Sequence, residues 1–325
     1  MKIVFFGTPS FSAYNLNHLI TNKYHICAVV CPSDKRKGRG KKLKSCAVKN
    51  TATANKIPVL QPENLKDPQF INQLNKINAD LFIVVAFRML PKEVWKMPRK
   101  GTINLHTSLL PEYRGAAPIN RVLINGETET GITTFFINEN IDSGKIIMQK
   151  KINISTETTA AQLHNILMKK GSQLLINTIE SLSKNPILIS QEKSEKLKTA
   201  PKLNKDLLKI KWEESAIKIH NLVRGLSPYI NENKILKDIA ICPSAFLILK
   251  NHPKETKRIK IQLTKTEIRT EKSLKNIDTD NHSYFRIGVK NHWLYILHLQ
   301  MEGKKPMTIK EFLNGYKINE NCKII

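Results

Sequence analysis

Three polar side chains in this sequence, Asn104, His106 and Asp142, are of the types that acyl transfer requires. Asn104 and His106 lie two residues apart at the end of an apolar segment, TINLH (102–106). If this segment is a β-strand, both side chains project from the same face. An amide and an imidazole placed side by side can stabilise an oxygen atom that gains negative charge in a tetrahedral intermediate.

Asp142 begins the turn sequence Asp142-Ser143-Gly144. A carboxylate that faced His106 would orient the imidazole and favour its protonated form. The spacing alone also fits a solvated histidine at a strand end and an ordinary Asp-Ser-Gly turn. Both alternatives stay open at this point.

The segments around these residues alternate between strand and helix patterns. Near-continuous apolar runs predict strands at 2–7, 25–31, 58–60, 81–87 and 102–106, and polar-apolar periodicity predicts helices at 9–22, 46–55 and 67–78. This alternation is typical of an α/β fold with a mostly parallel sheet wrapped by helices. Ligands of such sheets bind beyond the carboxyl ends of the strands, so the loops after 81–87 and 102–106 are expected on one rim.

The remainder of the chain changes character twice. A strand pair is expected at 130–137 and 145–154, and the capping-box spacing of Thr159 and Gln162 predicts a helix that ends near 183. Residues 190–206 are polar and lysine-rich, which favours a linker. A helix at 213–225 and short strands at 209–212, 245–250, 260–268, 284–290 and 293–300 then predict a small barrel. The predicted domains are therefore 1–189 and 207–325, joined by the linker 190–206.

Composition excludes several classes of protein. The chain has 325 residues, 41% of them hydrophobic, and no apolar run long enough to span a membrane. Its opening, MKIVFFGTPSF, fits a core strand better than a signal peptide. Five cysteines without CxxC pairs favour reduced thiols in the cytoplasm and no metal site. Because neither a GxGxxG pattern nor a Walker motif is present, no nicotinamide or flavin cofactor is expected.

The net charge of +26 favours a polyanionic partner. The excess is spread along the chain, however, with 26 basic against 12 acidic residues in 1–189 and 22 against 12 in 207–325. A base-biased genome would also produce such a lysine excess. A local signal is stronger: residues 33–49 hold eight basic side chains and one acidic one, Asp34. This density favours contact with a phosphate backbone over a passive solvated loop.

The sequence Asn104-x-His106-x-Ser-Leu-Leu-Pro111, followed by Tyr113 to Pro118 and by Asp142 to Gly144, resembles the folate-dependent formyltransferases. The resemblance extends over nearly the whole chain and is strongest to the members that act on a tRNA. It includes the segments IVFFGTPSF, KGRGKKL, NGETETGITTF, TAPKL, LVRGLSPY and GKKPMTIKEFLNG.

The resemblance implies a Rossmann-like formyltransferase domain followed by an OB-like β-barrel. It implies transfer of a formyl group from the co-substrate 10-formyltetrahydrofolate to methionine on initiator tRNA, by a cytoplasmic monomer without a metal. Asn104, His106 and Asp142 become the catalytic residues. The expected folate contacts are Ser108, Leu109, Leu110, Pro111, Phe87, Arg88, Met89 and Leu90, and the expected tRNA contacts are Lys37, Arg39, Lys41 and Lys42, with a further basic surface on the barrel.

Some positions depart from the family pattern. Thr107 and Arg88 stand where glycine is common, and Ile230-Asn231 follows LSPY in place of the usual proline and tryptophan neighbourhood. Arg88 leaves the fine shape of the folate pocket open. Three alternatives also remain: a formyltransferase for a small amine, which needs neither basic loop nor barrel, a non-catalytic tRNA-binding protein, and a hydrolase of formyltetrahydrofolate.

Overall fold

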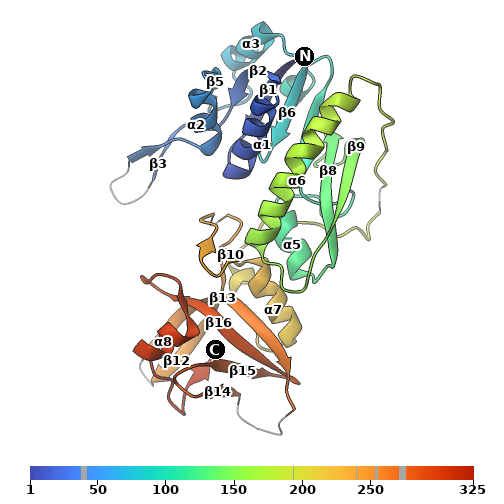
Figure 1. Ribbon diagram of the computed structural model, residues 1–325. Helices are drawn as coiled ribbons and strands as arrows, with labels where there is room; N and C mark the ends of the chain where they lie inside the picture. The colour runs from blue at the N-terminus through green and yellow to red at the C-terminus, as the bar shows by residue number, and fades with distance from the viewer. Residues whose placement is uncertain (38–41, 193, 239, 253–254, 271–275) are drawn as a thin grey trace. The chain divides into compact units, whose positions relative to one another are not determined.

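The computed structural model describes residues 1–37, 42–192, 194–238, 240–252, 255–270 and 276–325. The chain divides into two compact units (Figure 1). Unit 1 comprises Met1–Gly115, Thr130–Ile152 and Asn165–Thr199, and unit 2 comprises Ala116–Glu129, Asn153–His164 and Ala200–Ile325. The division 1–189, 190–206 and 207–325 inferred from the sequence stays a prediction.

A seven-stranded sheet of order β5-β2-β1-β6-β7-β8-β9 forms the framework of unit 1. Strands β5, β2, β1, β6 and β7 are parallel, and β8 runs antiparallel to β7. The bounds are β1 Lys2–Gly7, β2 His25–Val30, β5 Val59–Leu60, β6 Leu81–Val85, β7 Thr102–His106, β8 Glu129–Phe136 and β9 Ile146–Asn153. The predicted parallel sheet and the 130–154 strand pair are thus confirmed.

Helices cover both faces of this sheet. They are α1 Ser10–Thr21, α2 Ala47–Ala54, α3 Pro68–Ile77, α4 Lys92–Trp95 and α6 Ala160–Ser181. Residues of α3 and α4, including Leu74 and Val94, form one core cluster with Phe82 and Val84 of β6. Helix α6 begins with the predicted capping box, in which the Thr159 N–H donates to Gln162 Oε1 at 2.9 Å and the Gln162 N–H donates to Thr159 Oγ1 at 3.2 Å.

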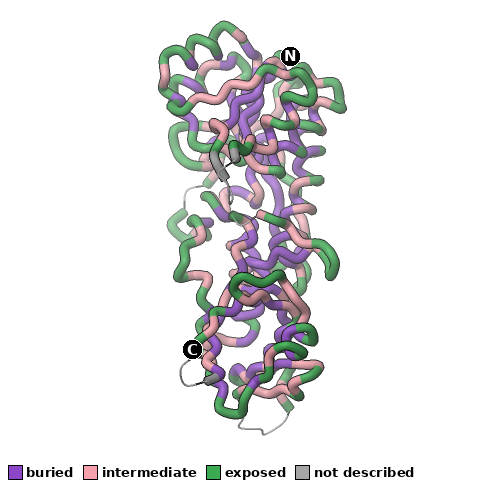
Figure 2. The backbone as a smooth tube through the Cα atoms, turned by 90° about the vertical axis from the view of Figure 1, so that its left-hand side faces the viewer, coloured by how far each residue is buried: buried purple, intermediate pink, exposed green. Residues whose placement is uncertain are grey.

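Helix α6 packs on the face opposite to α3 and α4. A Cβ atom added at Gly171 of α6 would lie 2.9 Å from Leu105 Cδ2 of β7, so the helix approaches the strand closely here and a larger residue would displace that leucine side chain. The hydroxyls of Thr134 in β8 and Thr178 in α6 form a 2.8 Å hydrogen bond on the same side. Because both faces of the central strands are covered, β6 is buried along its whole length. Figure 2 shows buried segments, in purple, running through the interior of unit 1.

A curled antiparallel sheet, of order β14-β15-β16-β13-β12-β18, dominates unit 2 and gives it an OB-like fold. Its strands are β12 Ala245–His252, β13 Glu255–Ile268, β14 Ile277–Thr279, β15 Phe285–Val289, β16 His292–Met301 and β18 Lys323–Ile324, and β17 Met307–Thr308 pairs with β16. The other elements are α5 Pro118–Ile124, the 3-10 turn Asp206–Leu208, α7 Ala216–Gly225, β10 Tyr229–Asn231, β11 Lys234–Ile235 and α8 Ile309–Gly315.

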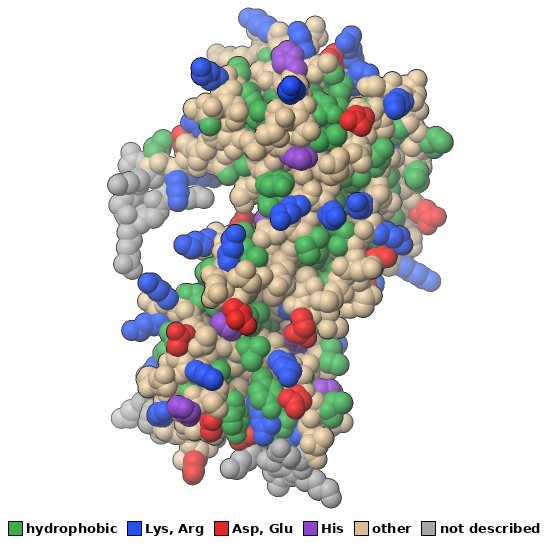
Figure 3. All heavy atoms as spheres, in the orientation of Figure 1, with side chains coloured by type: hydrophobic (Ala, Val, Ile, Leu, Met, Phe, Trp, Pro, Cys, Tyr) green, Lys and Arg blue, Asp and Glu red, His purple; other side chains and the backbone are tan. Residues whose placement is uncertain are grey.

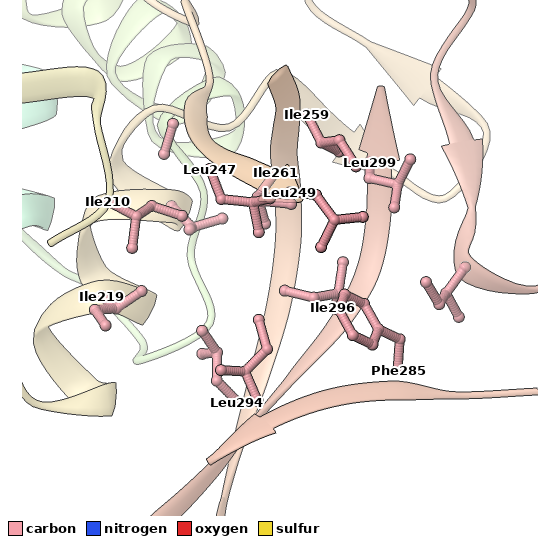
Figure 4. Packing of buried hydrophobic residues seen from close by; sticks show 14 of the residues in the cluster. Ile210, Ile219, Leu247, Leu249, Ile259, Ile261, Phe285, Leu294, Ile296 and Leu299 are labelled. Atoms are coloured by element: carbon pink, nitrogen blue, oxygen red, sulfur yellow. The ribbon is translucent and has the colours of Figure 1, made fainter. Parts of the chain in front are cut away.

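Aliphatic side chains from both the sheet and α7 fill the interior of unit 2 (Figure 4). Ile219 of α7 and Leu247, Ile261 and Ile296 of the sheet are each at most 2% exposed.

One predicted strand was wrong. Residues 209–212 form only an isolated bridge between Lys209 and Phe246, because the 3-10 turn and the start of α7 leave too short an extended segment between them.

The basic segment 33–49 was predicted as a loop, but it contains two short strands. Residues Lys35–Lys37 (β3) and Lys42–Lys44 (β4) pair as a short antiparallel hairpin. Residues 38–41 between them lie outside the described part.

None of the five cysteines forms a disulfide. Within the described ranges, no helix is long and apolar enough to cross a membrane.

Candidate active site

Strand β7 presents two of the three predicted catalytic residues on one face. Asn104 pairs with Phe135 and His106 with Thr133 across the β7–β8 ladder, so these four side chains share a face. Leu105 and Thr134 alternate with them and face α6. His106 is 7% exposed, whereas Asn104 is half-buried. Among the described residues, the Asn104 side-chain amide makes no hydrogen bond, which leaves its donors available to a substrate.

Asp142 reaches His106 from the loop between β8 and β9. Because β8 is antiparallel to β7, Phe136 at its end lies beside Ile103 near the start of β7. The loop nevertheless returns to the other end of β7 and places Asp142 Oδ2 3.7 Å from His106 Nδ1. This separation is too long for a hydrogen bond and short enough for a direct charge interaction.

The two nitrogens of His106 have different partners. Nε2 lies 2.9 Å from the Tyr113 carbonyl oxygen, which can only accept, so Nε2 carries a proton. The other nitrogen, Nδ1, is on the side of Asp142. The Asp142 carboxylate is held in turn by the Gly115 N–H, which donates to Oδ2 at 2.9 Å. The Asp142 carboxylate is therefore held in place opposite the Nδ1 edge of His106.

Unusual backbone geometry accompanies these contacts. Asp142 and Tyr113 adopt φ values of 49° and 58°, in the left-handed region that non-glycine residues rarely occupy. Gly144 lies so close to the Phe136 carbonyl that a Cβ atom there would stand 1.6 Å from the oxygen. The turn that carries Asp142 therefore requires glycine at position 144.

The segment Ser108 to Pro111 turns away from β7 through a buried hydrogen-bond network. Thr133 Oγ1 donates to the Ser108 carbonyl at 2.7 Å and accepts from the Leu110 N–H at 3.1 Å. Gln149 Nε2 donates to the Leu110 carbonyl at 2.7 Å and to Thr133 Oγ1 at 3.0 Å. The Leu110–Pro111 peptide bond is cis, and Leu109 packs against Gly131. Neither Thr133 nor Gln149 carried a sequence signal for this role.

The second predicted folate segment, Phe87 to Leu90, follows β6. Phe87 packs against Phe6 with ring centroids 5.8 Å apart, Leu90 is 5% exposed and Met89 is 75% exposed. The Arg88 guanidinium donates from Nη1 to the Glu63 carbonyl at 2.7 Å and from Nη2 to the Pro62 carbonyl at 2.5 Å. Arg88 therefore ties this loop to the one after β5.

Of the predicted tRNA contacts, Lys37 and Lys42 are paired in the backbone register of the β3–β4 hairpin, whereas Arg39 and Lys41 lie outside the described residues. A polar network stands at the base of this hairpin. Lys49 Nζ donates to Asp34 Oδ2 at 2.7 Å and Gln61 Nε2 donates to Asp34 Oδ1 at 3.0 Å. These bonds, first that of Lys49 and then that of Gln61, lower the pKa of Asp34.

Comparison with known proteins decides the family. A family model described as "Formyl transferase" matches residues 1–179, and one described as "Formyl transferase, C-terminal domain" matches 202–317. The chain belongs to the formyl transferase family. This formyl transferase is 45% identical to a methionyl-tRNA formyltransferase of Flavobacterium johnsoniae, over 100% of the chain and 99% of the relative. It is 41% identical to one of Thermodesulfovibrio yellowstonii, over 98% of the chain and 97% of the relative.

Solved structures share the fold of this formyl transferase. The N-formyltransferase from Helicobacter canadensis, solved with folinic acid and dTDP-3-aminofucose, is 20% identical with a TM-score of 0.61 and covers 93% of this chain and 99% of its own. A fold of this extent therefore also occurs in a formyltransferase solved with an amino sugar nucleotide. Within the described residues, no cluster of three or more His, Cys, Asp or Glu side chains could hold a metal ion.

Proposed function

We propose that this formyl transferase moves the formyl group of 10-formyltetrahydrofolate to the amino group of methionine on initiator tRNA. The observation that carries the proposal is the sequence identity of 38–45% to several methionyl-tRNA formyltransferases. This identity extends over nearly the full length of both aligned sequences. The product is the formylated initiator used at the start of translation. The enzyme acts as a cytoplasmic monomer in this proposal.

The geometry around β7 supports a mechanism without a covalent enzyme intermediate. As the methionine amine attacks the formyl carbon, a C–N bond forms and the formyl oxygen becomes negatively charged. The Asn104 amide and His106 Nδ1–H donate to this oxygen, because Nε2 is already bonded to the Tyr113 carbonyl. The tetrahedral intermediate then collapses, and the C–N bond to the folate nitrogen breaks.

Asp142 is the general base that accepts and returns a proton in this mechanism. The attacking amine must lose one proton, and the departing folate nitrogen must gain one. Asp142 lies 3.7 Å from His106 and is 17% exposed at its side chain, so it can accept the amine proton. Return of that proton to the folate nitrogen completes the transfer.

The predicted folate contacts fit the same region of unit 1. Ser108 to Pro111 continue directly from His106, and Phe87 to Leu90 follow the neighbouring strand β6. Because β6 and β7 are parallel, their carboxyl ends lie at the same edge of the sheet, where ligands of such folds bind. We assign these two segments to the folate, and Arg88 shapes the site indirectly through the 62–63 backbone.

Contact with tRNA is assigned to the basic hairpin and to basic residues of the barrel. Lys and Arg side chains are scattered over the face shown in Figure 3. A scattered charge attracts a polyanion without fixing its position, whereas the sequence 33–49 holds eight basic residues and one acidic residue. Lys37, Arg39, Lys41 and Lys42 of this segment are therefore proposed to contact the phosphates near the acceptor end.

The deciding experiment is incubation with 10-formyltetrahydrofolate and methionine-charged initiator tRNA. Uncharged tRNA, free methionine and an amino sugar nucleotide serve as controls. Formylation of the charged tRNA alone supports the proposal, and formylation of the amino sugar alone would reject it. His106→Ala and Asn104→Ala should each lower kcat about 10²–10³-fold, as loss of an oxyanion donor does. Near-normal turnover in both variants would reject the site.

A further inference from the structure

The segment 189–199 carries a glutamine whose amide is fully engaged beside the proposed site. Gln191 Nε2 donates to the Asp142 carbonyl at 3.0 Å and to the Gly144 carbonyl at 2.7 Å. Gln191 Oε1 accepts from Arg114 Nε at 3.0 Å and from Arg114 Nη2 at 2.6 Å. The two donors and two acceptor sites of this amide are therefore all in use.

Both ends of this segment are paired with residues next to the site. Ile189 and Ile146 exchange two backbone hydrogen bonds, of 2.8 and 3.0 Å, at the beginning of β9. At the other end, the Tyr113 N–H donates to the Lys198 carbonyl at 2.6 Å. The opposite side of the same residue, the Tyr113 carbonyl, accepts from His106. The segment thus supports the backbone around both His106 and Asp142.

We propose that Gln191 is a positioning residue for formyl transfer, which holds the Asp142–Gly144 turn so that the Asp142 carboxylate faces His106. This inference rests on the proposed function of Asp142. Three observations carry it. The backbone of Asp142 is in the left-handed region of φ. Gln191 donates to the carbonyl of this same residue. The charged guanidinium of Arg114 donates to the Gln191 amide oxygen and so fixes the glutamine side chain.

The physical consequence is that the segment 189–199 affects the rate of catalysis through the position of Asp142. The Asp142 carboxylate lies 3.7 Å from His106, a distance at which a shift of about 1 Å changes both charge interaction and proton transfer strongly. Without the two bonds from Gln191, the turn carries its left-handed residue with fewer restraints. The substrates would still bind, since Gln191 contacts the turn backbone and not the proposed folate segments.

The test compares Gln191→Leu and Gln191→Glu with Gln173→Leu. Gln173 is on the exposed side of α6 and bonds only to Asn177 in the described structure, so its variant controls for the loss of a glutamine. We expect Gln191→Leu to lower kcat about tenfold while KM for folate and for charged tRNA changes less than about threefold. Gln191→Glu keeps the size and the Arg114 partner but sets an oxygen against two carbonyls, so its kcat should fall at least as far.

A double-mutant cycle with Asp142→Asn separates positioning from general stability. In the Asp142→Asn background, Gln191→Leu should change kcat less than about twofold, although it lowers the melting temperature equally in both backgrounds. An unchanged kcat for Gln191→Leu alone, or an equal fold-loss in both backgrounds, would overturn the positioning role and leave the proposed function intact. Near-normal kcat for Asp142→Asn itself would overturn the proposed role of Asp142, and the positioning role with it.

Discussion

Thr133→Val is the substitution that tests the folate assignment most directly. Valine has nearly the shape of threonine, so the change removes a hydroxyl and leaves no cavity. Thr133 is 0% exposed, and its hydroxyl holds the Ser108 carbonyl and the Leu110 N–H at once. The variant therefore releases the turn that follows His106 and leaves β7 and β8 paired.

The magnitude follows from the groups that lose a partner. A buried donor or acceptor without a partner costs about 1–3 kcal/mol. The Ser108 carbonyl and the Leu110 N–H both lose theirs, so the free energy of unfolding should fall by about 2–6 kcal/mol. Movement of the turn can relieve part of this cost. If about 1.4 kcal/mol of folate binding is lost by that movement, KM for 10-formyltetrahydrofolate rises about tenfold.

Thr134→Val is the matched control, one residue along the same strand. Its hydroxyl is equally buried but bonds to Thr178 of α6 on the other face of the sheet. This variant should lose stability, by about 1–2 kcal/mol, with KM for folate unchanged. Urea denaturation followed by circular dichroism gives the stability, and initial rates give KM. Equal KM values for the two variants would refute the assignment of Ser108 to Pro111 to the folate.

Three further predictions address other parts of unit 1. Replacing Lys37 and Lys42 by Gln should raise KM for charged tRNA and flatten its salt dependence, with KM for folate unchanged, since each lost phosphate contact reduces the salt slope; an equal rise in both KM values would instead indicate misfolding. Gly144→Ala should lower kcat about tenfold or more, because its Cβ would stand 1.6 Å from the Phe136 carbonyl oxygen and displace the Asp142 turn; normal kcat would show that the turn adapts. A hydrogen bond from the Cys31 thiol, with those of the Lys49 and Val48 N–H groups, lowers the pKa of Cys46 to about 6. Its thiolate forms as pH rises through that value, so alkylation by iodoacetamide should reach half its maximal rate near pH 6, compared with about 8.5 for an ordinary thiol, as mass spectrometry of the peptide with Cys46 can show.

The sequence predicted the elements whose signals are local. Apolar runs identified the parallel strands of unit 1, and alternation within TINLH placed Asn104 and His106 on one face, as the β7–β8 register confirms. The capping box at Thr159 is equally local, and it is present. Such patterns are informative because strand and helix periodicities depend only on neighbouring residues.

The remaining features depend on contacts between distant segments. Asp142 meets His106 only because its loop reverses along the sheet, which no spacing between positions 106 and 142 encodes. Gln191 lies in a polar stretch predicted as a linker, yet its amide is fixed by Arg114, 77 residues earlier. Arg88 suggested an altered folate pocket from its type alone, whereas its guanidinium is bonded to backbone carbonyls. Hydrogen bonds of this kind leave no periodic trace in a sequence.

The alternation along β7 has a practical consequence for capturing substrate complexes. Leu105 and its neighbour Thr134 anchor the strand to α6, whereas Asn104, which is half-buried and has no partner among the described residues, stands on the other face. Chemistry and anchoring thus occupy alternate positions of one short strand. An Asn104→Ala protein should therefore fold normally and turn over its bound substrates about 10²–10³-fold more slowly, which makes it the variant of choice for trapping a ternary complex.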